Sequence, residues 1–354
     1  MNKGISRMFA VTLSAVLMLV GLVGLSGCAT TSTTEINVFT WAEYFPDFVF
    51  EGFTEKTGIK INFNAFTTNE EMLTKLEAVK GGTYDIILAS DYVVDIARKQ
   101  GLIAEIDKSK VPNFKNINPA YQSQFYDPDN TLSVPYAAGT PLIVYDPAKV
   151  SIDITGYEDL WNPALKESVV ILDDARNMVG VTLKTLGYSF NTQDDSELDQ
   201  AKEKLMQLKP NVRAFDYDTP HNLMISGEAT VGYMFTPQVV TALDERPDLK
   251  VVYPKEGMGW GIDSVFVPVD APNKEGAFAF LDYILDAEIG AQISESALYI
   301  CCNEASTAFL SEAYLNNKAL YIPAEVLGDA EYIMDVGDKS TKFQEIFAEF
   351  KQAK

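Results

Sequence analysis

The stretch "EINVFTWAEYFPDFVFEGFTEKTGIKINFNAF" (residues 35–66) decides the fold, because it places a helix pattern between two strand patterns. Its first seven residues are mostly apolar, and residues 59–66 alternate apolar with polar side chains, as half-buried strands do. Between them, Pro46 stands where a helix can begin and Gly58 where it can end. The stretch therefore predicts a strand, a helix and a second strand, which is the repeating unit of an α/β fold.

The same alternation continues along the chain. A further helix pattern is "NEEMLTKLEAVKGG" (69–82), and further strand patterns are "YDIILAS" (84–90), "SVVILDD" (168–174), "EATVGYMF" (228–235) and "GIDSVFVPV" (261–269). We expect one long helix over residues 273–298 and another over 341–352, whose apolar residues form a stripe along one face. This series predicts an α/β fold with a mostly parallel sheet covered by helices.

The N-terminal region has the pattern of a secreted lipoprotein. Residues 1–27 contain a basic start, an apolar run and a small-residue cleavage site, which together predict a signal peptide. Cys28 ends the sequence "LSGC", which resembles the bacterial lipobox and implies a lipid on Cys28, followed by a polar tether over 28–34. A transmembrane anchor is the alternative, although the apolar run barely reaches the ~20 residues that span a bilayer. We expect the protein in the cell envelope, lipid-anchored on the outer face of the cytoplasmic membrane or in the periplasm.

The composition limits the possible partners. Residues 1–27 contain two basic and no acidic residues, so the mature chain carries 26 basic against 50 acidic residues, a net charge of -24. Such a surface argues against nucleic acid as a partner and favours a cationic ligand, although acidity also serves solubility. About 325 mature residues are too many for one ordinary core and predict two domains.

Few residues of the chain suit metal binding or catalysis. Cys301 and Cys302 are neighbours, which disfavours a relaxed disulfide between them and gives no zinc-site spacing. His221 is the only histidine, and no GxSxG, Cys/His or HExxH pattern surrounds it. We therefore expect no catalytic residue, no cofactor and no metal. A hydrolase is the alternative, which turnover of the ligand during incubation would reveal.

The ends of the predicted strands are chemically alike. The segments "FTWAEY", "ILASDY", "VILDDARN", "GYMFT" and "GWGIDS" each supply an aromatic ring, an aspartate or both. In open α/β sheets, ligands bind beyond the carboxyl ends of the strands. Aromatic faces attract cations, and carboxylates neutralise an ammonium group that has lost its water, so the combination fits an alkyl cation.

Each of these residues also has a purely structural interpretation. Trp41 and Tyr44 can be core aromatics that cover a domain edge, and Ser90 can be a helix cap. The adjacent Asp173 and Asp174 suit the N-cap and first turn of a helix. Asp263 can pair with an arginine across a domain interface.

From Ile36 to nearly its end, the chain resembles the spermidine/putrescine-binding proteins of bacterial ABC transporters. The resemblance lies in "WAEYFPDFVFEGFTEKTGIKI", "YDIILASDYVVDIARKQGLIAEIDKSKVPNFKNINP", "FYDPDNTLSVPY", "DLWNPALKESVVILDDARN", "LKPNVRAF", "YPKEGMGWGIDSVFVP" and "MDVG". It implies a type II periplasmic-binding protein, or Venus flytrap, with two doubly wound α/β domains joined by hinge crossovers. Domain 1 would be 35–139 plus 260–306, and domain 2 would be 140–259 plus 307–354.

The resemblance also implies roles for individual residues and partners. Trp41 and Tyr44 match the family's stacking pair, Ser90 and Tyr92 its polar and aromatic wall, Asp174 and Asp263 its ammonium-binding carboxylates, Tyr299 a hinge-side ring, and Phe235 a position that often carries Trp. It further implies a monomer that delivers polyamines from an interdomain cleft to ABC permease subunits, without enzymatic activity.

The chain departs from the family pattern at several places. Asn177 stands where members usually have Glu, Ile333 replaces a Gln and Ala42 a hydroxyl residue. Gly261 stands where members of the family commonly have a Trp that covers the ligand. We expect the preceding Trp260 to supply this aromatic wall of the site. With one carboxylate fewer, the site favours the diamine putrescine over spermidine.

Other ligands and roles remain open at this point. A different organic solute with an acidic group needs a basic anchor, for which Arg176 is the candidate at a strand end. An iron-binding relative of the same fold usually offers adjacent tyrosines, which this chain does not have. A surface lipoprotein with a host-interaction role is a further alternative.

Overall fold

The predicted strand-helix-strand unit forms as β1 (Glu35–Trp41), α2 (Asp47–Thr57) and β2 (Lys60–Phe66). Pro46 is the N-cap of α2, and Gly58 ends it with a φ of 75°, a conformation that favours glycine. The computed structural model describes residues 34–353 except 43 and 328–329. The predicted signal peptide, the lipidation of Cys28 and the tether up to residue 33 lie outside the described residues.

The first sheet contains β1 next to the edge strand β2. Its strand order is β11-β4-β10-β3-β1-β2, with β12 paired to β10. The added strands are β3 (Ile86–Ser90), β4 (Ser133–Gly139), β10 (Gly259–Phe266), β11 (Ile300–Cys301) and β12 (Glu331–Tyr332). β1 is parallel to β2 and β3, whereas β10 is antiparallel to β3 and β4. The expectation of a mostly parallel sheet is therefore wrong for this sheet, because β10 enters it from the opposite direction.

The second sheet has the order β7-β6-β8-β5-β9. Its strands are β5 (Leu142–Tyr145), β6 (Val169–Ile171), β7 (Val212–Phe215), β8 (Val231–Met234) and β9 (Lys250–Val252). β6 is parallel to β7 and β8, and β5 is antiparallel to β8 and β9. The carboxyl ends of β6, β7 and β8 consequently lie at the same end of the sheet.

Helices pack against both sheets. They are α3 (Asn69–Val79), α4 (Asp91–Lys99), α5 (Ala175–Thr185), α6 (Asp195–Met206), α7 (Pro220–Ser226), α8 (Thr236–Glu245), α9 (Lys274–Ile284), α10 (Ala287–Ala297), α11 (Glu312–Asn316), α12 (Ala324–Leu327) and α13 (Ser340–Gln352). Short 3₁₀ helices cover Pro112–Asn116, Pro119–Tyr121, Tyr157–Trp161, Pro163–Leu165, Lys209–Asn211, Glu304–Ala308 and Gly337–Lys339. The architecture confirms the predicted α/β class with two sheets.

The single long helix expected over residues 273–298 is wrong. The segment forms α9 and α10, with Asp286 between them. The Asp286 carboxylate accepts hydrogen bonds from the backbone N–H groups of Glu288 (3.1 Å) and Ile289 (3.3 Å). An aspartate that caps a new helix competes with continuation of the old one, which explains the break.

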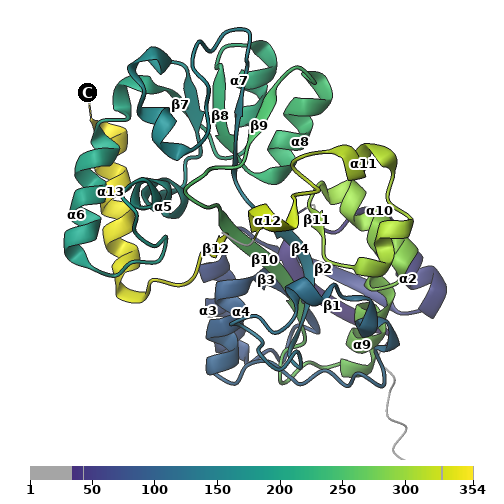
Figure 1. The fold of residues 1–354 in the computed structure, drawn as a ribbon. Coiled ribbons are helices and arrows are strands. Elements are labelled where there is room, and N and C mark those ends of the chain that lie inside the picture. Colours follow the sequence, from purple (N-terminus) through teal and green to yellow (C-terminus); the bar gives the residue numbers. More distant parts are fainter. Residues whose placement is uncertain (1–33, 43, 328–329, 354) are drawn as a thin grey trace, which may run out of the picture. The chain divides into compact units, whose positions relative to one another are not determined.

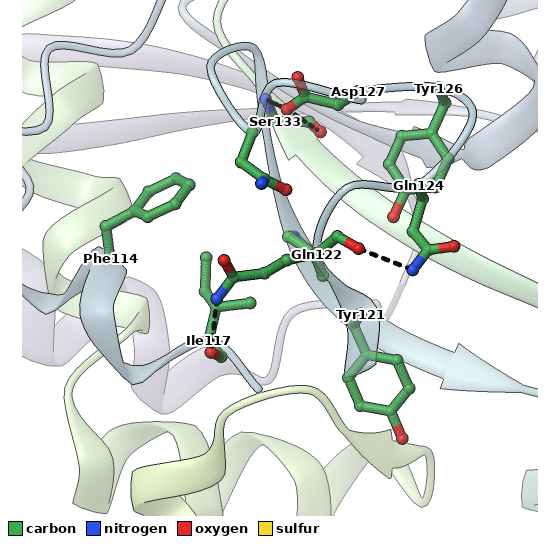
Figure 2. A pocket seen from close by; sticks show the side chains of 10 residues that line it. Phe114, Ile117, Tyr121, Gln122, Gln124, Tyr126, Asp127 and Ser133 are labelled. Atoms are coloured by element: carbon green, nitrogen blue, oxygen red, sulfur yellow. Dashed lines mark hydrogen bonds between the residues drawn. The ribbon is translucent and has the colours of Figure 1, made fainter. Parts of the chain in front are cut away.

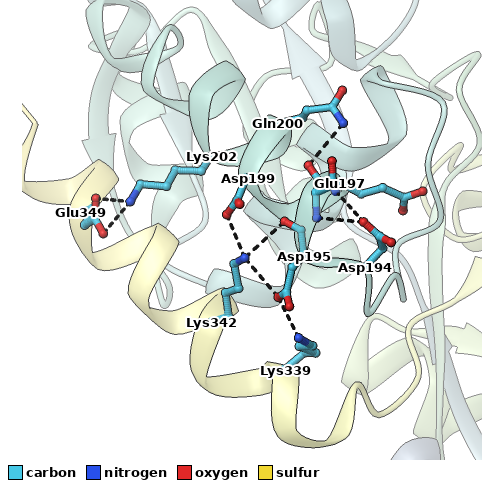
Figure 3. A network of polar contacts seen from close by, with 10 residues as sticks. Asp194, Asp195, Glu197, Asp199, Gln200, Lys202, Lys339, Lys342 and Glu349 are labelled. Carbon is cyan, nitrogen blue, oxygen red and sulfur yellow. Dashed lines mark hydrogen bonds and ion pairs between the residues drawn. The ribbon is translucent and has the colours of Figure 1, made fainter.

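The C-terminal helix α13 lies beside α5 and α6, as the yellow helix in Figure 1 shows. Its predicted apolar stripe is buried, with Phe343 and Phe350 completely inaccessible. On the polar side, Lys342 pairs with Asp195 (3.1 Å) and Asp199 (2.8 Å) of α6, and Lys202 pairs with Glu349 (2.6 Å) (Figure 3). Because exposed ion pairs contribute ~0–1 kcal/mol each, the apolar stripe is the main stabilising contact of α13.

The chain passes from one sheet to the other within Glu35–Lys354, which forms one compact unit. Between β4 and β5, the buried Thr140 donates its hydroxyl hydrogen to the carbonyl of Gly259 at 2.6 Å. The hydroxyl of Thr236 donates to the Thr140 carbonyl at 2.9 Å and accepts from the Thr140 N–H at 3.1 Å. The hydrogen bond from Thr140 to Gly259 therefore joins the first passage between the two sheets to the first residue of β10. Among the described residues, no helix is both long and apolar enough to cross a membrane.

Candidate functional site

The aromatic corner after β1 faces other rings. The Trp41 ring lies 4.9 Å from Phe66 and 5.1 Å from Tyr44, measured between centroids. Tyr44 in turn lies 5.6 Å from Tyr299, which covers the open side of Gly139 at the end of β4. The structure brings Trp41, Tyr44 and Tyr299 together, and each of the three residues is half-buried.

Asp263 on β10 joins this aromatic group. The Tyr44 hydroxyl donates a hydrogen bond to the Asp263 carboxylate, and Asp263 is paired in register with Ser90 at the end of β3. Burial raises the pKa of Asp263, while the hydrogen bonds from Tyr44 and Ser90 oppose that shift. In the part of the chain that the structure describes, no Lys or Arg forms an ion pair with Asp263, so the arginine-pairing interpretation finds no support.

Asp174 lies just beyond β6 in the second sheet and is the N-cap of α5. One oxygen, Oδ1, accepts both the backbone N–H (2.7 Å) and the side-chain amide (2.9 Å) of Asn177. Asn177 is 6% exposed, and its own Oδ1 has no hydrogen-bond partner among the described residues. Asp173, by contrast, is occupied by Lys351 at 2.6 Å. The interpretation of Asp174 as a helix cap is thus confirmed. The Oδ1 atom of Asn177, beside the Asp174 carboxylate, is left without a hydrogen-bond donor among the described residues.

Tyr217 is a residue of this region that the sequence interpretation missed. It follows β7, and its ring meets Phe235 edge-on at 5.6 Å. Half of the residue is exposed, at 50%, but withdrawal of its hydroxyl from water and the charges of Asp174 and Asp263 raise its pKa to about 12. Tyr217 therefore lies within electrostatic range of both carboxylates, one from each sheet. The segment "FDYD" ends a strand with an aromatic ring and aspartates, which is the pattern that identified the other strand ends.

The remaining predicted positions surround these groups less closely. The Tyr92 hydroxyl donates to the Glu70 carboxylate at 3.1 Å, and Ala42 is exposed in the turn after β1. Ile333 follows β12 and lies over Gly259, where an added Cβ would come within 2.9 Å of its Cδ1. The side chains of Ala42 and Ile333 are apolar, so neither can form a hydrogen bond or an ion pair with Asp174 or Asp263.

Trp260 is not brought together with Asp263. Successive side chains of a strand point to opposite faces, so Gly259, Gly261 and Asp263 share one face of β10, while Trp260 points to the other. There Trp260 is 4% exposed and stacks on Tyr121 with centroids 6.4 Å apart. The structure places Trp260 in core packing, and the face near Asp263 has no side chain at Gly261.

The Arg176 side chain forms hydrogen bonds to other segments of the fold. Its guanidinium donates to the carbonyls of Phe190 and Met334 and to the side chain of Asn191, each at 2.9 Å. It also lies over the Phe343 ring at 4.7 Å. Desolvation is the main cause that lowers the pKa of Arg176 to about 10, against the charges of Asp174 and Asp335. These bonds leave little of the guanidinium to anchor an anionic solute.

Two pockets of the described structure lie elsewhere, and both are small and partly open to the surface. The one in Figure 2 has a volume of about 10 Å³ for a water-sized sphere, and the other, beside Cys301 and Cys302, about 20 Å³. Each has room for roughly one water molecule. Asp127 in the first pocket already accepts three backbone N–H bonds and one from Ser133, so it is a structural carboxylate.

The described residues contain no cluster of three or more His, Cys, Asp or Glu that could hold a metal ion. Cys301 and Cys302 are free thiols in the structure. Burial raises the pKa of the Cys302 thiol well above its usual range, which disfavours the reactive thiolate.

The proteins to which this chain is similar include several that are named as polyamine-binding proteins. A spermidine/putrescine-binding periplasmic protein of Salmonella typhimurium is 37% identical over 329 residues, covering 93% of this chain and 94% of the relative. The putrescine-binding periplasmic protein SpuD of Pseudomonas aeruginosa is 30% identical and covers 91% of this chain and 92% of the relative. These relatives confirm the resemblance recognised in the sequence motifs.

The fold matches as well. The substrate-binding protein PotD of a spermidine/putrescine ABC transporter from Streptococcus pneumoniae superposes with a TM-score of 0.81 at 31% identity, covering 90% of this chain and 99% of that one. It confirms the two-domain periplasmic-binding fold. Residues 49–321 match the family described as bacterial extracellular solute-binding protein. Because this is a family of solute-binding proteins, the expectation of a non-enzymatic protein is confirmed. The chain belongs to the bacterial extracellular solute-binding protein family.

Proposed function

We propose that this protein is an extracytoplasmic solute-binding lipoprotein that captures polyamines, with putrescine favoured over spermidine, and delivers them to an ABC permease. The observation that carries the proposal is the arrangement around Tyr217. Two half-buried carboxylates, Asp174 from one sheet and Asp263 from the other, both act on its hydroxyl, and neither has an ion-pair partner among the described residues.

A diammonium chain satisfies this arrangement chemically. One ammonium group donates to Asp263 and the other to Asp174, while the rings of Trp41, Tyr44 and Tyr299 cover the methylenes. Two charged hydrogen-bonded ends contribute ~1.5–3 kcal/mol each and four buried methylenes ~0.8 kcal/mol each. That scale corresponds to micromolar affinity, about 8 kcal/mol.

Asn177 supports a diamine over a triamine. Its amide adds an acceptor beside Asp174 but no second negative charge. A triamine brings a third ammonium group, which loses its water on binding and needs a further carboxylate. With one carboxylate at each end of the site, the charge balance favours putrescine.

Ligand capture is proposed to occur by closure of two domains, 35–139 plus 260–306 and 140–259 plus 307–354. In the open state, half-exposed rings and carboxylates admit the ligand. Closure removes water, which strengthens the attraction between the ammonium groups and Asp174 and Asp263. Relatives named as spermidine/putrescine-binding and putrescine-binding proteins support this ligand class.

The proposed location follows from the N-terminal sequence and the family. Cys28 would carry the lipid that holds the protein at the outer face of the cytoplasmic membrane or in the periplasm. There the protein would act as a monomer and present its loaded form to the permease subunits. No cofactor takes part in this cycle.

Replacement of Asp263 by asparagine tests the proposal. Asp263→Asn keeps the side-chain volume but removes the charge, and we expect putrescine binding to weaken at least tenfold in isothermal titration. Asp270→Asn, an exposed carboxylate shortly after β10, is the matched control and should leave the affinity unchanged. Equal affinity of Asp263→Asn and the unmodified protein would remove Asp263 from the site.

A further inference from the structure

Asp91 is a buried carboxylate for which the proposed binding scheme has no use. It is the first residue of α4 and is 2% exposed. Its Oδ2 accepts the backbone N–H of Ile262 at 3.1 Å, and its Oδ1 accepts the N–H of Tyr92 at 2.7 Å. Both donors are neutral, so the charge of Asp91 is not compensated by them.

The position of Asp91 connects it to Asp263. Ser90, which precedes Asp91, is the register partner of Asp263, and Ile262, which donates to Asp91, precedes Asp263. At Gly261, an added Cβ would meet only the Oδ2 atom of Asp91 within 4 Å, at 4.0 Å. Since Gly261 and Asp263 share one face of β10, the two carboxylates lie on the same side of the strand with no side chain at the position between them.

The groups around this pair supply no positive charge. Tyr92, Tyr126 and Tyr332 respond to the charge of Asp91. The phenols of Tyr44 and Tyr299 and the thiol of Cys302 respond to Asp263. Within the described ranges, neither Asp91 nor Asp263 forms an ion pair with Lys or Arg. Two neighbouring carboxylates, one buried and one half-buried, cannot both ionise readily without a cation beside them.

The titration behaviour agrees with this geometry. Burial, opposed by the two backbone N–H bonds and increased by the charge of Asp263, raises the pKa of Asp91 to about 8. Burial also raises the pKa of Asp263.

We propose that Asp91 and Asp263 share one proton while the site is empty, and that an ammonium group of the ligand displaces this proton when it binds. The inference rests on the proposed polyamine function and adds its regulation by pH. No covalent bond of the ligand changes. The carboxyl O–H of the pair gives its proton to water, and the ligand's N–H groups take its place as hydrogen-bond donors.

The sign of the pH dependence follows directly. Below about pH 8 the empty pair holds a proton that the cation must displace, so the apparent affinity rises as the pH rises. Alkyl ammonium groups lose their own proton only near pH ~10, so the ligand stays charged over this range. Between pH 6 and pH 7 the affinity for putrescine should increase close to tenfold, with about one proton released per bound ligand.

Titration of putrescine into the purified protein measures this release. At one pH, the observed binding enthalpy is compared between two buffers with different ionisation enthalpies. The difference between the two binding enthalpies, divided by the difference between the two ionisation enthalpies, gives the number of protons released. We expect about one proton at pH 7 and fewer as the pH rises through 8. Binding without proton release would overturn the inference and leave the proposed function standing, whereas no binding at any pH would remove the proposed function.

Two variants assign the proton. Asp91→Asn mimics the protonated carboxyl, so it should bind putrescine more weakly than the unmodified protein at pH 7, with an affinity that stays flat as the pH rises and without proton release. Asp85→Asn is the control, because Asp85 is also buried and bound by backbone N–H groups but lies at the opposite end of β3. It should leave the proton release unchanged. Proton release that persists in Asp91→Asn would overturn the role of Asp91. The proton count for the unmodified protein remains a test of the inference even if one of the variants does not fold.

Discussion

Asp174 shows how one residue serves the fold and the proposed site together. Its Oδ1 caps α5 through Asn177, which fixes the carboxylate at the end of β6. A cap held by the backbone loses little further side-chain entropy when a ligand binds. A structural and a functional interpretation of an aspartate at a strand end are therefore compatible.

At the residue scale, Tyr217 gives a direct prediction. Tyr217→Ala removes an aromatic face within electrostatic range of Asp174 and Asp263, and the loss of ~0.5–2 kcal/mol of cation-π attraction should weaken putrescine binding about two- to thirtyfold. Fluorescence or calorimetric titration measures the change. Tyr321→Ala, at another tyrosine with an exposed side chain (59%), is the control and should bind normally. Unchanged affinity of Tyr217→Ala would exclude its ring from the ligand contact.

Individual site residues were predictable to different degrees. Trp41 and Tyr44 could be proposed from the sequence because they stand at the end of a strand. Asp263 lies within β10 but is paired in register with Ser90 at the end of β3, and the structure brings the three side chains together. The side of the strand on which Trp260 lies was predicted wrongly from the sequence. Trp260 is one position away from the family's Trp at Gly261, and neighbouring side chains of a strand point to opposite faces of the sheet. Tyr217 has the same sequence signal as its neighbours but lies after a strand that was not recognised.

At the element scale, local signals determined most helix and strand positions. Pro46 and Gly58 bound α2 as the sequence predicts, whereas Asp286 divides one expected helix into two. Strand direction had no comparable local signal. The pairing of β10 between β3 and β4 depends on contacts between segments more than a hundred residues apart, so the antiparallel part of the first sheet could not be inferred.

The first turn of α5 carries a prediction about stability. Arg176 joins α5 to Phe190, Asn191 and the segment after β12. Arg176→Gln removes hydrogen bonds to two part-buried acceptors and one exposed acceptor together with the ring contact to Phe343, and should lower the free energy of unfolding by about 2–4 kcal/mol in a denaturant titration. We expect putrescine affinity to change little, because the guanidinium is already bound within the fold.

Arg213→Gln is the matched control for this experiment. Arg213 pairs with Glu228 at 2.9 Å, but both side chains are about half exposed, at 44% and 54%. Its loss should change the stability by ~0–1 kcal/mol. If Arg176→Gln keeps full stability but abolishes binding, Arg176 belongs to the ligand site, and an anionic solute becomes the better candidate.

At the scale of the whole molecule, two sheets present their strand ends to a common set of charged and aromatic residues. Thr140 and Thr236 join the crossing between the sheets through buried hydrogen bonds. The fold class and the two-domain organisation could be predicted from the order of elements and from family motifs. The position of Asp91 behind Gly261 could not, since it depends on three-dimensional packing of α4 against β10.

The most direct test of the account is isothermal titration of purified protein, freed of bound ligand by unfolding and refolding, with putrescine, cadaverine, spermidine and spermine. The account predicts micromolar or tighter binding of putrescine and weaker binding of spermidine. Much tighter binding of spermidine would contradict the diamine preference. Absence of heat and of thermal stabilisation with all four amines would contradict the central claim that Asp174 and Asp263 form a polyamine site.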